Sequence, residues 1–234
     1  MRRDTVLFDI NESILDLSSL RPKFKAAFGD EAVTGLWFSN LLHSSTVCAL
    51  TGVKTNFGNL ASAMLDTVAA RLNITLSVSV RDEILGAFAH LPVHGDVKPA
   101  LERFRSSGYR TIAFSNSSID LIERQIQNAG LSDYYDDIVS VEKSGSFKPD
   151  AKAYLYVANY IDRPIGDLCL VATHDWDTHG AMTAGMMAAY IDRSGVPYHP
   201  LYLKPGVYST SMDDIVTQVL KQDGHANAQQ VDGD

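Results

Sequence analysis

The sequence has little cysteine. Its 234 residues include two cysteines, Cys48 and Cys169, which lie far apart and inside apolar stretches. This placement argues against a disulfide or a redox site and predicts two buried, reduced thiols in a cytoplasmic protein.

Long basic and long apolar segments are absent too. Basic residues never run beyond the pair Arg2-Arg3, and the formal net charge is −8, so no nucleic-acid footprint is visible. No apolar stretch reaches the roughly 18 residues of a membrane span. Asp4 and Asp9 interrupt the region where a signal peptide would have its apolar core. We expect a cytoplasmic protein with no nucleic-acid and no membrane partner.

What the chain does contain is an alternation of strand-like and helix-like patterns. Strands are predicted at 5–10, 109–114, 137–141, 167–172 and 187–191. Helices are predicted at 99–105, 118–129 and 150–161. Several strand runs are too continuously apolar for a sheet with one face in water. The alternation therefore predicts an α/β fold, with a parallel sheet covered on both faces.

Residues 14–93 break this rhythm. They contain no convincing strand, and helical stretches fit near 19–28, 31–50, 58–73 and 80–90. This predicts a helical cap domain inserted between the first two strands, with the chain returning near Leu91–Gly95. The core domain would then comprise 1–13 and 94–222, and the polar tail 223–234 would be disordered.

Polar residues follow four of the predicted strands. Asp9 ends the first, and the later clusters are Ser115-Asn116, Lys148 and His174–Asp177. Open α/β sheets place their active sites at the carboxyl ends of their strands. Taken alone, Asp9 is as readily explained as a turn former, but the ordered set of clusters indicates a site.

The residue types suit nucleophilic catalysis by a carboxylate. Asp9 can attack an electrophilic centre and form an ester or acyl phosphate. Lys148 can stabilise its charge, and Ser115 and Asn116 can donate hydrogen bonds to an anion. An acid on the last loop, such as Asp177, can orient the lysine and water or bind a metal.

The chain resembles the haloacid dehalogenase superfamily, and within it the type II L-2-haloacid dehalogenases. The matching pieces are Phe8-Asp9 with Ser13, Phe114–Ser117, Lys148–Asp150 with Tyr154, Trp176-Asp177 with Gly180-Ala181, and Ile191–Arg193. The resemblance covers nearly the whole chain. It implies a Rossmann-like parallel sheet with a helical cap, often as a homodimer. It also implies hydrolysis of a short 2-haloacid to the 2-hydroxy acid through an aspartyl ester, without metal or cofactor.

The resemblance also implies roles for individual residues. Asp9 corresponds to the nucleophile, Lys148 to the lysine that neutralises its surroundings, and Asp177 to the acid that orients lysine and water. The substrate-binding positions it implies are Ser13, Leu42, Phe57, Ser115, Asn116, Tyr154 and Trp176.

One departure from the family pattern lies in the predicted cap. The family has an arginine after Leu-Trp that grips the substrate and receives the halide, whereas Leu36-Trp37 is followed by Phe38. No arginine lies between Arg21 and Arg71 to replace it. Stabilisation of the halide would then fall to Asn116, ring edges and backbone donors, with Phe38 in the substrate pocket.

Two further departures from the family pattern involve residues that can act as a pair. Glu12 stands where the family commonly has glycine, and His174 where it has asparagine. Both loops meet at the same edge of the predicted sheet, so Glu12 can orient His174 as a general base. We hypothesise that His174 activates the water that hydrolyses the Asp9 ester. The alternative is that Glu12 is solvated and His174 only fills space.

Two other functions stay open. A magnesium-dependent phosphatase of the same superfamily would need an acid two positions after the nucleophile, and Asn11 cannot donate that proton. Asp175 and Asp177 could still bind Mg²⁺ with Asp9. A non-catalytic protein that keeps the fold would explain the missing arginine. It would not explain a buried lysine near carboxylates, because burying that charge destabilises the fold and is not expected where it serves no function.

Overall fold

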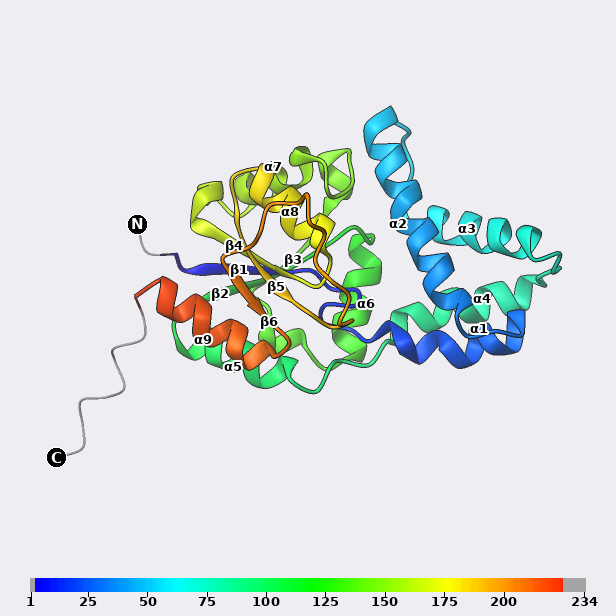
Figure 1. Ribbon diagram of the computed structural model, residues 1–234, viewed down its shortest axis with the longest axis horizontal. Coiled ribbons are helices and arrows are strands. Elements are labelled where there is room, and N and C mark those ends of the chain that lie inside the picture. The colour runs from blue at the N-terminus through cyan, green and yellow to red at the C-terminus, as the bar shows by residue number, and fades with distance from the viewer. Residues whose placement is uncertain (1–2, 225–234) are drawn as a thin grey trace.

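The computed structural model describes residues 3–224 and contains one six-stranded sheet (Figure 1). Every neighbouring pair of strands is parallel, in the order β3-β2-β1-β4-β5-β6. The strands are β1 (Thr5–Phe8), β2 (Arg110–Ser115), β3 (Asp137–Ser140), β4 (Leu168–Ala172), β5 (Met187–Ile191) and β6 (Val207–Ser209). The predicted α/β class with a parallel sheet is confirmed.

Helices cover both faces of this sheet. Helices α5 and α9 lie on one face, and α7 and α8 on the other (Figure 1). The helices that follow the cap segment are α5 (Val97–Ser106), α6 (Ile119–Asn128), α7 (Ala151–Tyr160), α8 (Asp175–Thr183) and α9 (Met212–Gln222), with short 3-10 helices η3 (Ser132–Tyr134), η4 (Val141–Ser144) and η5 (Ile165–Asp167). The central strands β1 and β4 are buried along their whole length, which explains their continuous apolar runs.

The regular elements of residues 17–90 are all helices, as their sequence predicts. They form η1 (Leu17–Leu20), α1 (Arg21–Phe28), α2 (Val33–Thr51), α3 (Phe57–Arg71), α4 (Val78–Ala87) and η2 (Phe88–His90). Helices α1 to α4 lie to one side of the sheet in Figure 1. Trp37 is fully buried among them, where its Nε1 donates to the Ala61 carbonyl (2.9 Å) and its ring packs against Phe24 and Phe88.

The segments that lead into and out of these helices run side by side. Leu15 pairs with Val93 in an antiparallel bridge, and the amide of Asp16 donates to the Pro92 carbonyl (2.7 Å). Residues 91–95 therefore run beside the segment that leaves β1. The division into core and cap domains stays a prediction.

Among the α-helices and strands, helices α8 and α9 and strand β6 were given no range from the sequence. Helix α8 has no apolar stripe, and its buried residues include Asp177 and Thr178. Strand β6 is too short for an alternating pattern. Helix α9 does carry apolar residues at helical spacing, from Met212 to Val219, and this signal was missed.

Other expectations concern particular residues. Cys48 and Cys169 are buried and unpaired, as predicted. Most of the predicted tail, residues 225–234, lies outside the described residues, whereas Asp223 accepts a hydrogen bond from Tyr109 (2.7 Å). Within residues 3–224, no helix is both long and apolar enough to cross a membrane.

Candidate active site

The candidate site lies at the carboxyl ends of the central strands. The parallel register pairs Phe8 with Ala113 on one side and with Val171 on the other. Asp9 directly follows β1, and its amide donates to the Val171 carbonyl (3.0 Å). Side chains that follow β1, β2 and β4 therefore meet at one edge, as expected for such a sheet.

The loop after β1 turns sharply at Glu12. This residue has a φ of 65°, in the left-handed region that disfavours residues with a side chain. The turn is held by the Glu12 amide, which donates to the Leu15 carbonyl (2.9 Å), and by His94 Nε2, which donates to the Glu12 carbonyl (3.0 Å). A strained conformation supported in this way is common at functional sites.

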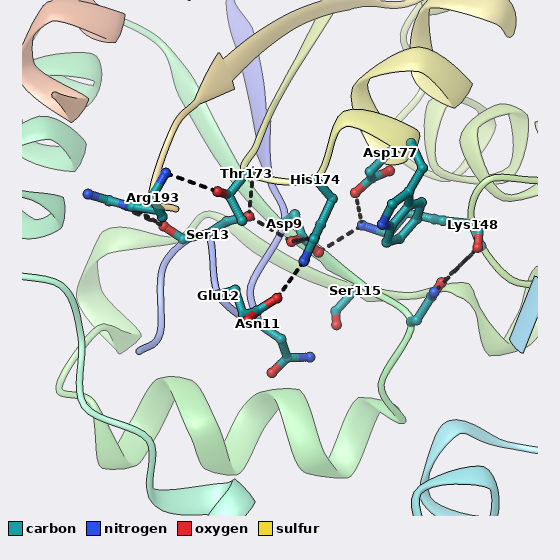
Figure 2. Close-up of polar contacts among 12 residues, drawn as sticks. Asp9, Asn11, Glu12, Ser13, Ser115, Lys148, Thr173, His174, Asp177 and Arg193 are labelled. Carbon is teal, nitrogen blue, oxygen red and sulfur yellow. Dashed lines mark hydrogen bonds and ion pairs between the residues drawn. The ribbon is translucent and has the colours of Figure 1, made fainter. Parts of the chain in front are cut away.

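Asp9 is a buried carboxylate with three polar neighbours (Figure 2). Its Oδ1 accepts from Lys148 Nζ (2.9 Å), and its Oδ2 accepts from Ser13 Oγ (2.7 Å) and lies 3.3 Å from His174 Nδ1. Burial alone would raise the pKa of Asp9. The Lys148 charge, His174 and Ser13 together outweigh burial and hold this pKa well below its usual range, so Asp9 is ionised at neutral pH.

Lys148 joins two carboxylates. Its Nζ also donates to Asp177 Oδ2 (2.6 Å), and the other oxygen of Asp177 accepts from the Tyr154 hydroxyl (2.6 Å). Burial would lower the pKa of Lys148, but the charges of Asp177 and Asp9 raise it above its usual value. The ammonium is therefore charged and held in place between the two acids.

His174 bridges Asp9 and Glu12. Its Nε2 lies 2.7 Å from Glu12 Oε2, so the pair meets as the sequence led us to expect, while its role as a base stays a prediction. The ring stacks on Trp176 with centroids 5.1 Å apart and lies 6.2 Å from the Phe38 ring. Burial would lower the pKa of His174, but its contacts with the two carboxylates raise it to about 10. The imidazole is therefore a cation in the resting site.

The Ser115-Asn116 pair sits at the end of β2, and both residues are buried. Asn116 Oδ1 accepts from the Lys148 amide (2.9 Å), and its Nδ2 donates to the Lys148 carbonyl (3.5 Å). Asn116 thus fixes the backbone of Lys148, a role that the sequence did not suggest. One hydrogen of its amide nitrogen remains for a ligand.

Two cavities flank the Glu12–His174 pair. One, of about 550 Å³, is lined by Phe38, Leu42 and Trp176, three of the residues expected in the substrate pocket. The other, of about 520 Å³, is lined largely by polar side chains that include Arg21 and Arg193. Phe57, also expected in the pocket, lines neither cavity and instead packs against Phe147.

Residues to which the sequence assigned no role support the nucleophile. The Thr173 amide donates to Ser13 Oγ (2.9 Å), and Arg193 donates to the Ser13 carbonyl (3.3 Å). Arg193 is itself held by two hydrogen bonds to Asp96 (2.8 and 2.9 Å). Thr173 lies next to His174 at the end of β4, so its position in the sequence could have identified it as a residue of the site.

Asn11 belongs to a buried polar network. Its Oδ1 accepts from Gln125 (3.0 Å), and its Nδ2 donates to Ser117 Oγ (3.2 Å). Both ends of the amide are therefore engaged away from Asp9. Gln125 lies on the buried face of α6, and its polar character within that apolar stripe hinted at such a partner.

The acids of the last loop offer little to a metal. Asp177 has both oxygens bound by Lys148 and Tyr154, and Asp175 accepts from the amides of Trp176 (2.7 Å) and His199 (3.1 Å). Across residues 3–224, no group of three or more His, Cys, Asp or Glu side chains is arranged to hold a metal ion.

Comparison with known proteins places the chain among hydrolases. The family model for haloacid dehalogenase-like hydrolases matches residues 4–171. The (S)-2-haloacid dehalogenase H-109 of Pseudomonas putida is 25% identical over 202 residues, covering 86% of this chain and 90% of that protein. Haloacetate dehalogenase H-2 of Moraxella is 21% identical over 215 residues, covering 91% and 96%.

Solved structures show the same fold. The L-2-haloacid dehalogenase of Xanthobacter autotrophicus with covalently bound chloropropionic acid superposes with a TM-score of 0.86. It is 20% identical to this chain, and the match covers 94% of this chain and 98% of that one. The likeness extends to both the sheet and the helices of residues 17–90.

Proposed function

The chain belongs to the haloacid dehalogenase-like hydrolases, and we propose that it hydrolyses the carbon–halogen bond of a 2-haloalkanoic acid to the 2-hydroxy acid. The observation that carries this proposal is the environment of Asp9. A buried carboxylate that stays ionised beside Lys148, Ser13 and His174 suits attack on carbon. The relatives named as (S)-2-haloacid dehalogenases support the same class of reaction.

In the first half-reaction, a carboxylate oxygen of Asp9 attacks C2 of the substrate. The new carbon–oxygen bond forms as the carbon–halogen bond breaks, and the halide leaves with the bonding electrons. We assign binding of the substrate carboxylate or the halide to Ser115 and the second amide hydrogen of Asn116, which lie at the same sheet edge. Position 38 is a phenylalanine and not the family's arginine. The imidazolium of His174 is the nearby cation that can stabilise the departing halide in its place.

In the second half-reaction, water attacks the carbonyl carbon of the Asp9 ester. Esterification removes the negative charge of Asp9, which is one of the two carboxylate charges that keep His174 protonated. The pKa of His174 then falls, and the ring loses one proton to solvent. Glu12 can carry this proton outward, because its side chain contacts the ring and is 36% exposed. The neutral imidazole can accept the proton of the attacking water.

The cycle then closes with its atoms balanced. The tetrahedral intermediate releases the product alkoxide, which takes a proton from the new carboxyl group, and His174 retains the proton it took from water. The site returns to an Asp9 carboxylate beside an imidazolium. Each turnover therefore consumes one water and yields one 2-hydroxy acid, one halide and one proton.

Asn11 argues against phosphoryl transfer. A phosphatase of this superfamily would need a proton donor there, and the Asn11 amide is engaged by Gln125 and Ser117. The contacts of Asp175 and Asp177 also leave no free carboxylate pair for Mg²⁺. The cytoplasmic location and the homodimer stay predictions from the sequence and the resemblance.

Halide release tests the proposal. Wild-type protein should release halide from one enantiomer of 2-chloropropionate or from haloacetates without added metal, and Asp9→Asn should reduce the rate by about 10³-fold or more. Asp82→Asn, which changes an exposed aspartate of α4, serves as the matched control. Phosphate release from a substrate panel that depends on Mg²⁺ would instead favour the phosphatase.

A further inference from the structure

The cavity of about 550 Å³ beside His174 has a mainly apolar wall. Its apolar and aromatic lining residues come from both sides of the cleft, and they are Phe38, Leu42, Trp176, Tyr190, Val196 and Pro197. Helix α2 supplies the first two, while α8, β5 and the segment after β5 supply the others. The volume falls within the range of small-molecule sites, roughly 300–1,000 Å³, and far exceeds what the methyl group of a 2-halopropionate fills.

His174 lies between the cavity and the reacting centre. It lines the cavity, and Nδ1 of the same ring lies 3.3 Å from Asp9 Oδ2. Trp176, which stacks on His174, extends the apolar wall outward. Asp9 itself does not line the cavity, so a chain attached to a carbon under attack by Asp9 has to pass His174 to enter it.

The acidic groups in the lining are already engaged. The two Asp175 oxygens accept from backbone amides, and Glu12 is paired with His174. The polar cavity on the other side of the Glu12–His174 pair has no comparable apolar wall, because Arg21, Arg193 and Asp16 line it. Of the two cavities that flank the Glu12–His174 pair, the one on the Phe38 and Trp176 side is the more favourable for an apolar group.

We propose that this cavity binds the aliphatic tail of a medium-chain 2-haloalkanoic acid, so that the preferred substrate is longer than a haloacetate or halopropionate. The substitution of Phe38 for a cation contributes to this preference, because it extends the apolar surface on the cap side of the cleft. This inference rests on the proposed function, since it assigns a tail to the acid that Asp9 attacks.

A chain-length series tests the inference. Halide release would be measured with single enantiomers of 2-bromopropanoate, 2-bromohexanoate and 2-bromooctanoate. We expect kcat/KM to rise about threefold for each methylene that enters the cavity. Val196→Asp should cancel most of this rise, because it places a charge in the apolar wall at a residue with 61% of its surface accessible.

A matched control and a binding measurement separate the possible failures. Leu201→Asp changes an exposed leucine of the same segment that does not line the cavity, and it should leave the whole series unchanged. Calorimetric binding of 2-hydroxyoctanoate and lactate reports the tail site without any chemistry. Halide release that is flat or falls with chain length overturns the inference alone. No halide from any acid overturns the proposed function, and the inferred cavity then stands only if Val196→Asp weakens binding of 2-hydroxyoctanoate.

Discussion

Nδ1 of His174 lies 3.3 Å from Oδ2 of Asp9, while Nε2 of the same ring lies 2.7 Å from Glu12. One imidazole thus joins the nucleophile to an acid at the edge of the cleft. The charge of Asp9 helps to keep the ring protonated, so any reaction that neutralises Asp9 also releases the ring to act as a base. Four predictions test this site.

His174→Gln should stop the reaction halfway. The variant keeps Asp9 and Lys148, so it should still form the ester, more slowly without the imidazolium beside the halide, and release about one halide per protein. Hydrolysis of the ester should slow by about 10²-fold or more. Intact-protein mass spectrometry would detect the ester as an added 2-carboxyalkyl group on Asp9. His179→Gln, in helix α8, which begins directly after His174, is the control. Full turnover by His174→Gln with no trapped ester would rule out His174 as the general base of ester hydrolysis.

Glu12→Gln should shift the pH dependence of hydrolysis. Glu12 is one of the two carboxylates that raise the pKa of His174, so its neutral analogue should let the imidazole lose its proton at lower pH. We expect the rise of ester hydrolysis with pH to move down by about one pH unit, measured by single-turnover decay of the trapped ester. An unchanged pH profile would show that Glu12 does not act on His174.

The charge of His174 should also appear in the stability of the protein. Its pKa is 6.5 in the reference state and about 10 in the folded protein, so the folded state binds the proton more tightly. This stabilisation is complete below pH 6.5 and is lost as the pH rises to about 10. The Tm advantage of wild type over His174→Gln should therefore shrink by roughly 5 °C between pH 6 and pH 10. A constant difference would contradict a raised pKa.

Lys148→Met should destabilise the fold. It would leave Asp9 and Asp177 buried without the ammonium that both now contact. Removing one partner of a buried ion pair costs about 3–5 kcal/mol, to be measured by urea unfolding. Lys152→Met, at an exposed lysine of α7, should cost less than about 0.5 kcal/mol. Without the ammonium, Asp9 and Asp177 can share a proton. The loss of unfolding free energy in Lys148→Met should therefore become smaller at low pH.

Much of the fold could be predicted because its signals are local. The central strands of the parallel sheet are continuous apolar runs, and the buried stripe of α7, from Ala153 to Ala158, has helical spacing. Helix α8 could not be predicted in this way, because it buries Asp177 and Thr178 instead of an apolar stripe. Its position depends on contacts with Lys148 and Tyr154, which lie far away in the sequence.

The sequence by itself determined which side chains reach the carboxyl edge, because a residue that follows a parallel strand must lie there. The sequence was therefore enough to predict that Asp9, Lys148 and His174 are neighbours. Only the tertiary structure decided which nitrogen of His174 faces Asp9, that Asn116 holds the backbone of Lys148, and that Phe57 lies outside the cleft. These features depend on side-chain packing between segments distant in sequence, and no local pattern encodes such packing.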